Sequence, residues 1–315
     1  MGIVETNFQI EHSPAKAVPR LPVTAIVPVR NEAHNLARCL GALREVDEIY
    51  VVDSGSTDDT CSIAASHGAK VVQFHYAGGW PKKRQWAMDN LAIANDWILL
   101  IDADEVLTPE LGEEIRGAIQ SAAIVDPPID RQAIGPKGIV GYRIRLEMHF
   151  LGRVLRHCDA SFWKLSLFRK GRGRFECRLK DQDTSMADME VHEHVVVDGP
   201  TAELRHPLIH HNVESLSRYI QKHNEYSNWE ARVLAGEQND QELPASLSGS
   251  QAQRRRWLKL KLYRLPGSPI LLFLYRYLLR LGFLDGTPGL IYCAFQAVQM
   301  FHTKAKIFEL RNRRR

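Results

Sequence analysis

The sequence is poor in the features that mark secreted or membrane-spanning proteins. Its 315 residues contain five scattered cysteines and no C-x-x-C pair, so neither a zinc site nor a disulfide framework is indicated. Apolar runs are short: residues 270–275 and 289–295 are strongly apolar, but neither approaches the ~20 residues of a spanning helix. Residues 1–20 lack the apolar core of a signal peptide. We expect a cytoplasmic protein with a flexible N-terminal arm.

Charge is unevenly distributed along the chain. Residues 254–315 carry 14 Lys and Arg against 2 Asp and Glu, a net charge of +12. The preceding 253 residues carry 27 against 35, a net charge of −8. A basic tail on an acidic body favours a polyanionic partner, either membrane phospholipid or nucleic acid. The apolar content of the tail favours lipid, so we expect an anionic membrane surface and no nucleic acid.

Strand and helix patterns alternate in the first third of the chain. Apolar, β-branched runs predict strands at residues 23–29, 48–53, 70–74 and 97–101, with helical stretches between them. Repeated βα units with short connections imply a parallel sheet with right-handed crossovers. Ligands of such sheets bind at the carboxyl ends of the strands. Because Asp53, Asp102 and Asp104 stand at these ends, we expect them to converge on one crevice.

The fourth of these strands runs directly into acid. Asp102 and Asp104 are two residues apart, and residues i and i+2 of an extended chain point to the same side. Two hard oxygen ligands suit Mg²⁺ or Mn²⁺, which can in turn hold a diphosphate. The alternative interpretation is an N-cap for the helix that begins near residue 108. The pair alone is weak evidence, and its context favours the metal site.

The rest of the chain is less regular. Alternating patterns predict half-exposed strands at residues 141–146 and 164–169, and residues 190–197 form a further candidate strand. A helical pattern starts at Ser215, and residues 243–253 read as a polar linker. The apolar C-terminal segments predict basic amphipathic helices that lie in a membrane interface. Core helices that pack on the body are the alternative.

Three segments in this order resemble the family 2 glycosyltransferases, which have the GT-A fold: residues 24–32, 51–58 and 101–105. The resemblance covers roughly residues 22–115. Residues 168–171, 191–195 and 282–286 resemble a narrower branch that builds bacterial surface glycans, including lipopolysaccharide-core glucosyltransferases. The resemblance implies an α/β fold: a Rossmann-like, nucleotide-sugar-binding GT-A domain with a mostly parallel central sheet, followed by C-terminal amphipathic helices.

The resemblance also implies roles for residues on the donor side. Pro28, Arg30 and Glu32 would form the loop that cradles the nucleotide, although Glu32 could instead be an ordinary first-turn helix acid. Asp53 would accept hydrogen bonds from uracil or ribose, with an N-cap as the alternative. Asp104 would bind the metal.

Asp102 would contact the ribose or bind the metal through water. Residues 82–85 place cations between the third strand and the acidic pair, where they could neutralise the donor's diphosphate. Lys83 and Arg84 are our candidates, and a solvated helix start is the alternative interpretation.

The catalytic base is harder to assign. Inverting transfer needs a carboxylate that removes the proton of the acceptor hydroxyl as it attacks. Glu193 is the best candidate, and its competitors lie in the same acidic stretch: Asp181, Asp183, Asp188 and Glu190. His210 follows another predicted strand and could complete the metal shell, although a lone histidine there is more often structural.

Together these features predict a metal-dependent, inverting glycosyltransferase that uses Mn²⁺ or Mg²⁺. It would move a hexose from a nucleotide-diphosphate sugar, UDP-linked in our interpretation, to a glycolipid or surface-polysaccharide acceptor such as lipopolysaccharide core, exopolysaccharide or cell-wall glycan. A nucleotidyltransferase of sugar phosphates is one alternative, although no Gly-rich phosphate loop is visible. A non-catalytic, membrane-docked scaffold that has kept the fold is the other.

The predicted domain organisation has four parts. Residues 1–20 form the arm, and residues 21–235 form the catalytic domain, with a donor half at about 21–115 and an acceptor half at about 140–235. Residues 236–253 form a linker. Residues 254–315 form a basic helical region that attaches the enzyme peripherally to the inner face of the cytoplasmic membrane.

Overall fold

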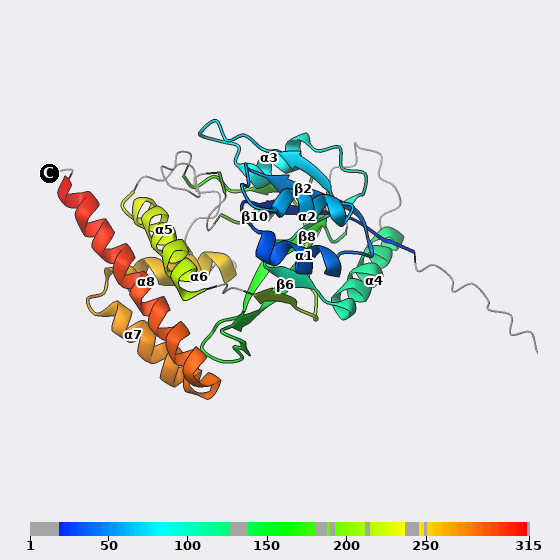
Figure 1. The fold of residues 1–315 in the computed structure, drawn as a ribbon. Helices are drawn as coiled ribbons and strands as arrows, with labels where there is room; N and C mark the ends of the chain where they lie inside the picture. The colour runs from blue at the N-terminus through cyan, green and yellow to red at the C-terminus, as the bar shows by residue number, and fades with distance from the viewer. Residues whose placement is uncertain are drawn as a thin grey trace, which may run out of the picture.

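The computed structural model describes residues 19–125, 138–179, 188–189, 193–211, 215–236, 246–248 and 251–313. Among these residues, one large sheet forms the centre of the molecule. α4 (Pro109–Val125) lies at one end of the molecule, and α7 (Ser268–Leu274) and α8 (Gly286–Arg313) lie at the other (Figure 1).

The sheet has the strand order β3-β2-β1-β4-β8-β6-β12-β5. Its first half is parallel and comprises β3 (Lys70–Gln73), β2 (Val46–Asp53), β1 (Leu21–Val29) and β4 (Trp97–Leu100). These are the four predicted strands, and their order confirms the α/β fold with a mostly parallel sheet. Because β1 and β4 are adjacent and parallel, their carboxyl ends lie side by side.

The second half mixes directions. β8 (Phe162–Arg169) is antiparallel to β4 and to β6 (Gly141–Phe150). β12 (Leu208–His211) runs parallel to β6 and antiparallel to the short β5 (Glu105–Leu107). The smaller strands are β7 (Arg153–Val154) and β11 (Thr201–Glu203), both paired with β6, and the separate pair β9 (Gly173–Phe175) and β10 (Val195–Val197).

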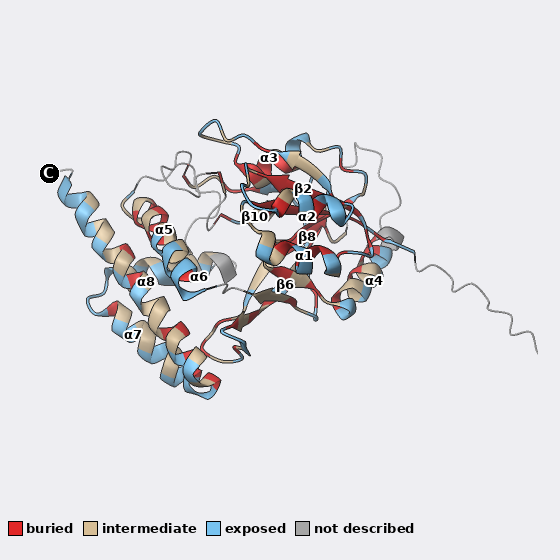
Figure 2. Cartoon of the chain, in the orientation of Figure 1, coloured by how far each residue is buried: buried red, intermediate tan, exposed pale blue. Residues whose placement is uncertain are grey.

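Helices cover the sheet and bury apolar side chains against it. α1 (Ala33–Ala42) buries Leu36 and Leu40 in the main core with the odd-numbered residues of β1. α2 (Thr60–Ser66) and α4 add to that core. α3 (Lys83–Asn90) lies over the opposite face, where Ile26, Ile98 and Leu100 form a second cluster. Figure 2 shows the buried sheet between these helices.

α3 occupies only part of the stretch between the predicted strands at residues 70–74 and 97–101. It ends at Leu91, whose backbone is extended (φ −76°, ψ 142°), and the chain then turns toward β4. The predicted strand at residues 190–197 is also shorter: β10 begins at Val195, and residues 190–192 lie outside the described part of the chain.

The C-terminal helices pack on the body. α5 (Leu216–Leu234), α6 (Gln251–Arg264), α7, the π-helical turn η1 (Tyr275–Leu279), the 3-10 turn η2 (Gly282–Asp285) and α8 follow one another. Tyr292 and Cys293 of α8 join Met148 and Phe150 of β6 in a buried cluster. No described helix is long and apolar enough to span a membrane. α8 is therefore partly a core helix, the alternative left open by the sequence.

Candidate active site

The acidic turn after β4 is built around Asp102. Its carboxylate receives Arg84 of α3 on one oxygen, at 2.5 Å, and Lys164 of β8 on the other, at 2.8 Å. Lys164 also contacts the buried Glu105 at 2.9 Å, and Glu105 accepts the backbone N–H of Asp102 at 2.9 Å. Burial would raise the pKa of Asp102, but the charges of Arg84 and Lys164 outweigh it and hold the pKa well below its usual range. Asp102 is therefore ionised and fixed in orientation.

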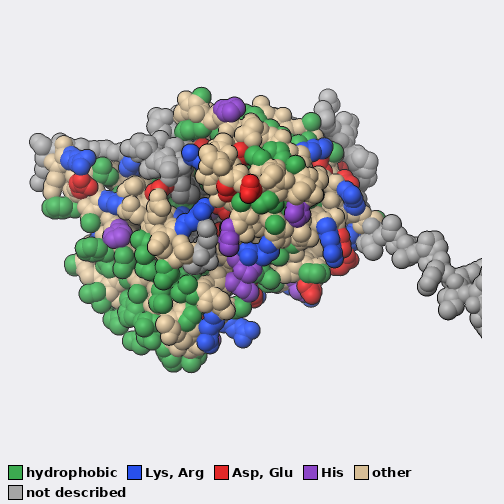
Figure 3. Space-filling view, in the orientation of Figure 1, with side chains coloured by type: hydrophobic (Ala, Val, Ile, Leu, Met, Phe, Trp, Pro, Cys, Tyr) green, Lys and Arg blue, Asp and Glu red, His purple; other side chains and the backbone are tan. Residues whose placement is uncertain are grey.

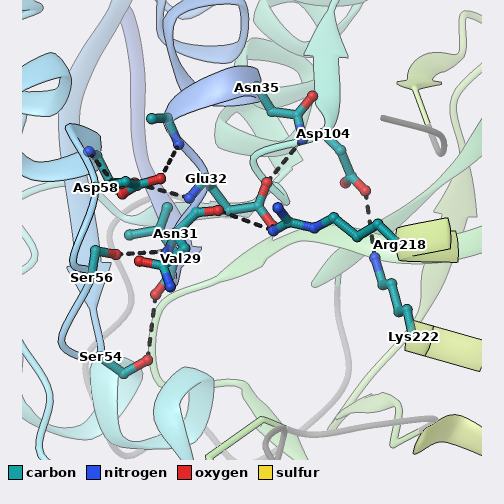
Figure 4. Close-up of polar contacts among 12 residues, drawn as sticks. Val29, Asn31, Glu32, Asn35, Ser54, Ser56, Asp58, Asp104, Arg218 and Lys222 are labelled. Atoms are coloured by element: carbon teal, nitrogen blue, oxygen red, sulfur yellow. Dashed lines mark hydrogen bonds and ion pairs between the residues drawn. The ribbon is translucent and has the colours of Figure 1, made fainter. Parts of the chain in front are cut away.

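Asp104 faces the end of β12 instead. Its carboxylate oxygen Oδ2 lies 3.2 Å from Nε2 of His210 and 3.8 Å from Nζ of Lys222 on α5. Figure 4 shows Lys222 directed toward Asp104. Burial opposes ionisation of Asp104, but His210 and Lys222 lower its pKa. The antiparallel pairing of β12 with β5 places His210 opposite Glu105, one residue past Asp104.

Asp104 and His210 fit a divalent cation between them. Two ligands at ~2.1 Å from one ion and at right angles to each other lie ~3 Å apart, which is close to the 3.2 Å observed. The other ring nitrogen, Nδ1, is buried without a hydrogen-bond partner among the described residues. No cluster of three His, Cys, Asp or Glu side chains suited to a metal occurs in the described part of the chain. A metal site at Asp104 and His210 therefore stays a prediction.

The carboxyl ends of β1 and β2 are joined by a network of hydrogen bonds. The backbone N–H of Asn31 donates to Ser56 Oγ at 2.8 Å, and Asn31 Oδ1 accepts the N–H of Thr57 at 2.7 Å. Figure 4 shows the contact between Asn31 and Ser56 beside Val29 and Ser54. Asn31 adopts a left-handed backbone (φ 54°), a conformation that asparagine tolerates better than most residues. The two loops thus form one hydrogen-bonded rim at the carboxyl ends of the parallel strands.

Asp53 belongs to this rim. Its buried carboxylate accepts the N–H of Gly55 at 3.2 Å and of Ser56 at 3.0 Å, together with the Ser56 hydroxyl. Burial would raise the pKa of Asp53, but the hydrogen bonds from Ser56 lower it. These bonds close the turn after β2, whereas α2 begins seven residues later with Asp59 at its N-cap position, so Asp53 is not the N-cap of that helix. A contact with uracil or ribose stays a prediction.

The other predicted nucleotide contacts lie near the same rim. Pro28 is buried in β1 opposite Val52, and Arg30 is exposed directly after the strand. The Glu32 carboxylate accepts Asn35 Nδ2 at 2.9 Å and lies 3.9 Å from Arg218 of α5. Burial, the largest influence, raises the pKa of Glu32.

The three cations at the start of α3 each hold one protein carboxylate. Lys82 pairs with Glu193 at 3.1 Å, Lys83 with Asp188 at 3.0 Å, and Arg84 with Asp102. The side chains of Lys82 and Lys83 are fully buried, so the alternative of a solvated helix start is wrong for both. Lys83 also donates to the carbonyl of Val29 at 2.9 Å and connects α3 to the end of β1. In this structure Lys83 has no exposed surface on which a diphosphate could rest, whereas Arg84 lies at the crevice beside Asp102.

Glu193 is buried as well. One oxygen of its carboxylate contacts Lys82, and the other accepts the backbone N–H groups of Arg178 at 2.7 Å and Leu179 at 3.3 Å. Burial raises the pKa of Glu193, although Lys82 opposes this. Glu193 can reach an acceptor hydroxyl only if its carboxylate breaks these contacts. Its role as the catalytic base therefore stays a prediction. Of its competitors, Asp188 is paired with Lys83, while Asp181, Asp183 and Glu190 lie outside the described residues.

Lys164, Lys222 and Glu105 are site residues that the sequence analysis did not single out. Glu105 was visible as the end of the acidic motif, but nothing local showed that it would turn inward. Lys164 and Lys222 lie 62 and 118 positions beyond Asp102 and Asp104, respectively. Only the pairing of β8 with β4 and the packing of α5 bring them in. The sole local signal was a lysine at the start of the predicted strand at residues 164–169.

A parallel βα half-sheet with paired acids after its fourth strand is the arrangement that the resemblance to GT-A glycosyltransferases predicted. Comparison with known proteins agrees. Residues 24–165 match the family described as Glycosyl transferase family 2, so this segment of the chain is a glycosyl transferase family 2 domain.

Two relatives are similar over nearly the whole chain. The lipopolysaccharide core biosynthesis glycosyltransferase LpsC of Rhizobium meliloti (strain 1021) is 27% identical, and the match covers 93% of this chain and 94% of that protein. An uncharacterized glycosyltransferase, RC0292, of Rickettsia conorii is also 27% identical over 91% and 90% of the two chains. A solved mannosyltransferase of Pyrobaculum calidifontis, in complex with GDP-Man and Mn²⁺, is 15% identical over 94% of this chain and 91% of that chain, with a TM-score of 0.48.

Proposed function

We propose that this glycosyltransferase moves a hexose from a nucleotide-diphosphate sugar, UDP-linked in our reading, to a hydroxyl group of a glycolipid or growing surface polysaccharide, with inversion. One observation carries the proposal: at the end of β4, Asp102 is ionised and held by two cations, and Asp104 faces His210. This is an arrangement for a charged diphosphate and its counterion.

In this proposal Asp104 and His210 would hold Mn²⁺ or Mg²⁺. A bound divalent cation stabilises the negative charge of a departing diphosphate. Arg84 would also contribute to binding the diphosphate, because its side chain is 12% exposed beside Asp102. A guanidinium there can donate a hydrogen bond to a phosphate oxygen while it still orients Asp102. Asp102 itself would contact the ribose or a metal-bound water.

The rim formed by the β1 and β2 ends would take the nucleoside. Pro28 stands near the end of β1, Arg30 and Glu32 follow in the loop after it, and Asp53 orients the loop after β2. Lys83 donates a hydrogen bond to the Val29 carbonyl at the end of β1. We propose that it contributes to donor binding by holding this rim in place.

Glu193 remains our candidate base for the acceptor. Its carboxylate would have to break its contact with Lys82 and accept a hydrogen bond from the acceptor hydroxyl instead. The raised pKa of Glu193 suits a group that takes up a proton. The acceptor class rests on the similarity to the lipopolysaccharide-core enzyme and on the apolar C-terminal helices. We propose that these helices hold the enzyme on the inner face of the cytoplasmic membrane.

Donor hydrolysis tests the proposal without knowledge of the acceptor. The purified chain would be incubated with a panel of UDP- and GDP-sugars, with and without Mn²⁺, and nucleotide release would be measured. We expect metal-stimulated release from one donor. Release of pyrophosphate from a sugar phosphate and a nucleoside triphosphate would instead support a nucleotidyltransferase.

A further inference from the structure

A pocket of about 370 Å³ lies where the loop between β7 and β8 meets the turn between η1 and η2. It shares no lining residue with the donor crevice. Its polar lining residues come from β6, the 155–161 loop and the end of η1: Arg145, Arg156, His157, Asp159, Ser161 and Arg280.

The pocket carries surplus positive charge. The exposed side chains of Arg145 and Arg156 have no hydrogen bond or ion pair with any described residue. Arg280 is only loosely paired, at 3.7 Å from Asp159. Guanidinium groups present a planar fork of donors that matches the oxygens of a phosphate. The pocket therefore suits a phosphate-bearing ligand.

The walls of the pocket are fixed before any ligand arrives. The buried Asp285 carboxylate accepts the backbone N–H of Arg156 at 3.2 Å and of His157 at 2.9 Å. From η1, Arg276 donates to the carbonyl of Cys158 at 2.9 Å. These bonds hold the 155–161 loop against η1 and η2. Binding of a ligand would therefore cost little further conformational entropy in this loop.

An apolar ridge begins at the rim of the pocket. Leu281 lines the pocket itself. Four exposed apolar side chains flank it in the sequence: Leu278, Leu279, Phe283 and Leu284. Leu279 is 76% exposed. Figure 3 shows hydrophobic side chains gathered over the α7 and α8 end of the molecule. Exposed apolar patches of this kind mark contact with a protein or a membrane.

The ridge extends into a groove along α7 and α8. The groove has a volume of about 350 Å³, is almost entirely apolar and is lined by residues such as Ile270, Phe273 and Phe301. Asp285 is the sole acidic residue in the sequence from residue 268 to residue 300, and it is buried. No carboxylate of this segment would therefore have to be desolvated in an apolar phase.

We propose that this pocket binds the phosphate of an anionic membrane lipid while the adjoining ridge and groove contact its acyl region. The inference deepens the proposed function and rests on its membrane-bound acceptor.

Vesicle binding of the full chain tests this proposal. Phosphatidylcholine vesicles would carry either phosphatidylglycerol or oleate at matched surface charge, so that the anion is a phosphate or a carboxylate. We expect tighter binding to the phosphatidylglycerol vesicles. The Arg145→Gln/Arg156→Gln variant should lose this preference and bind them roughly 25-fold more weakly, from about fivefold for each basic residue near an anionic surface.

A matched control removes the same charge elsewhere. Arg44 and Arg205 are exposed residues outside the C-terminal helices, and Arg44→Gln/Arg205→Gln should change binding less than about twofold. Leu279→Ser should weaken binding to both kinds of vesicle. Equal losses in the two double variants, or binding unchanged in Arg145→Gln/Arg156→Gln, would overturn the proposal. So would binding of inorganic phosphate to the pocket without any preference between vesicles.

Donor hydrolysis in the absence of vesicles separates this inference from the proposed function. Both arginine double variants should retain it, because neither pair belongs to the donor crevice. If the variants change vesicle binding as expected but the wild-type chain hydrolyses no donor, the lipid-binding proposal is supported and the transferase proposal is contradicted.

Discussion

Arg84 Nη2 lies 2.5 Å from Asp102 Oδ1, which joins the first turn of α3 to the end of β4. The two preceding residues also form ion pairs: Lys83 with Asp188, and Lys82 with Glu193. The start of α3 therefore connects the donor crevice to the segment that holds the candidate base. Of the three cations, Arg84 is the one at the crevice.

Arg84→Gln should lower kcat/KM for donor hydrolysis by about 10-fold to 100-fold, because a hydrogen bond to a charged group contributes ~1.5–3 kcal/mol. The variant leaves Lys164 on Asp102, so the fold should persist. Steady-state kinetics with the hydrolysed donor measures the effect. Arg44→Gln, which removes an exposed charge of the same type, should behave as wild type; identical kinetics of the two variants would exclude Arg84 from the site.

Lys82 and Glu193 form a buried ion pair with no exposed side-chain surface. Removing one partner leaves an uncompensated buried charge, so Lys82→Met alone should lower the free energy of unfolding by about 3–5 kcal/mol. The Lys82→Met/Glu193→Gln double variant should recover a large part of that loss. Urea denaturation of the three proteins measures the recovery.

The same variants decide the role of Glu193. If it is the base, Glu193→Gln abolishes transfer to an acceptor, and the double variant stays inactive although it is more stable than Lys82→Met. Transfer by the double variant at near wild-type kcat would show that Glu193 is structural.

Asp285 contributes a pH-dependent part of the stability. Burial would raise its pKa, but the hydrogen bonds from His157 and Arg156 lower it. A carboxyl whose folded pKa is depressed stabilises the fold above its unfolded pKa of about 3.9, and this contribution is lost as the pH falls through the folded pKa.

Asp285→Asn should therefore be less stable than wild type by roughly 1–3 kcal/mol at pH 7, and the difference should shrink as the pH is lowered toward 3. Thermal or urea unfolding at a series of pH values measures it. Glu45→Gln, at an exposed carboxylate, is the control and should show no such trend. A difference that stays constant with pH would contradict the account of this clamp.

Local patterns predicted the parallel half of the sheet well. β1 and β4 are largely apolar and buried runs, as expected of parallel strands that are covered on both faces. The acids at their ends were visible for the same reason. The partners of these acids were not, because Lys164, His210 and Lys222 reach Asp102 and Asp104 through β8, β12 and α5.

The basic run at residues 82–84 shows the limit of charge patterns most clearly. A sequence shows that cations are present but not what neutralises them. Here Asp188 and Glu193, more than 100 positions further along the chain, take Lys83 and Lys82 into the interior. The C-terminal helices are similar: their apolar residues are visible in the sequence, but which of them face β6 and which stay exposed depends on the packing of α8.

The central claim is that the acidic turn after β4 performs nucleotide-sugar chemistry. Its most direct test is nucleotide release from the hydrolysed donor by wild type and by Asp104→Asn, a substitution of nearly equal shape, in the presence of Mn²⁺. We predict release by wild type and a loss of at least ~100-fold in the variant, which should remain folded by circular dichroism. Equal release by the two proteins would contradict the account.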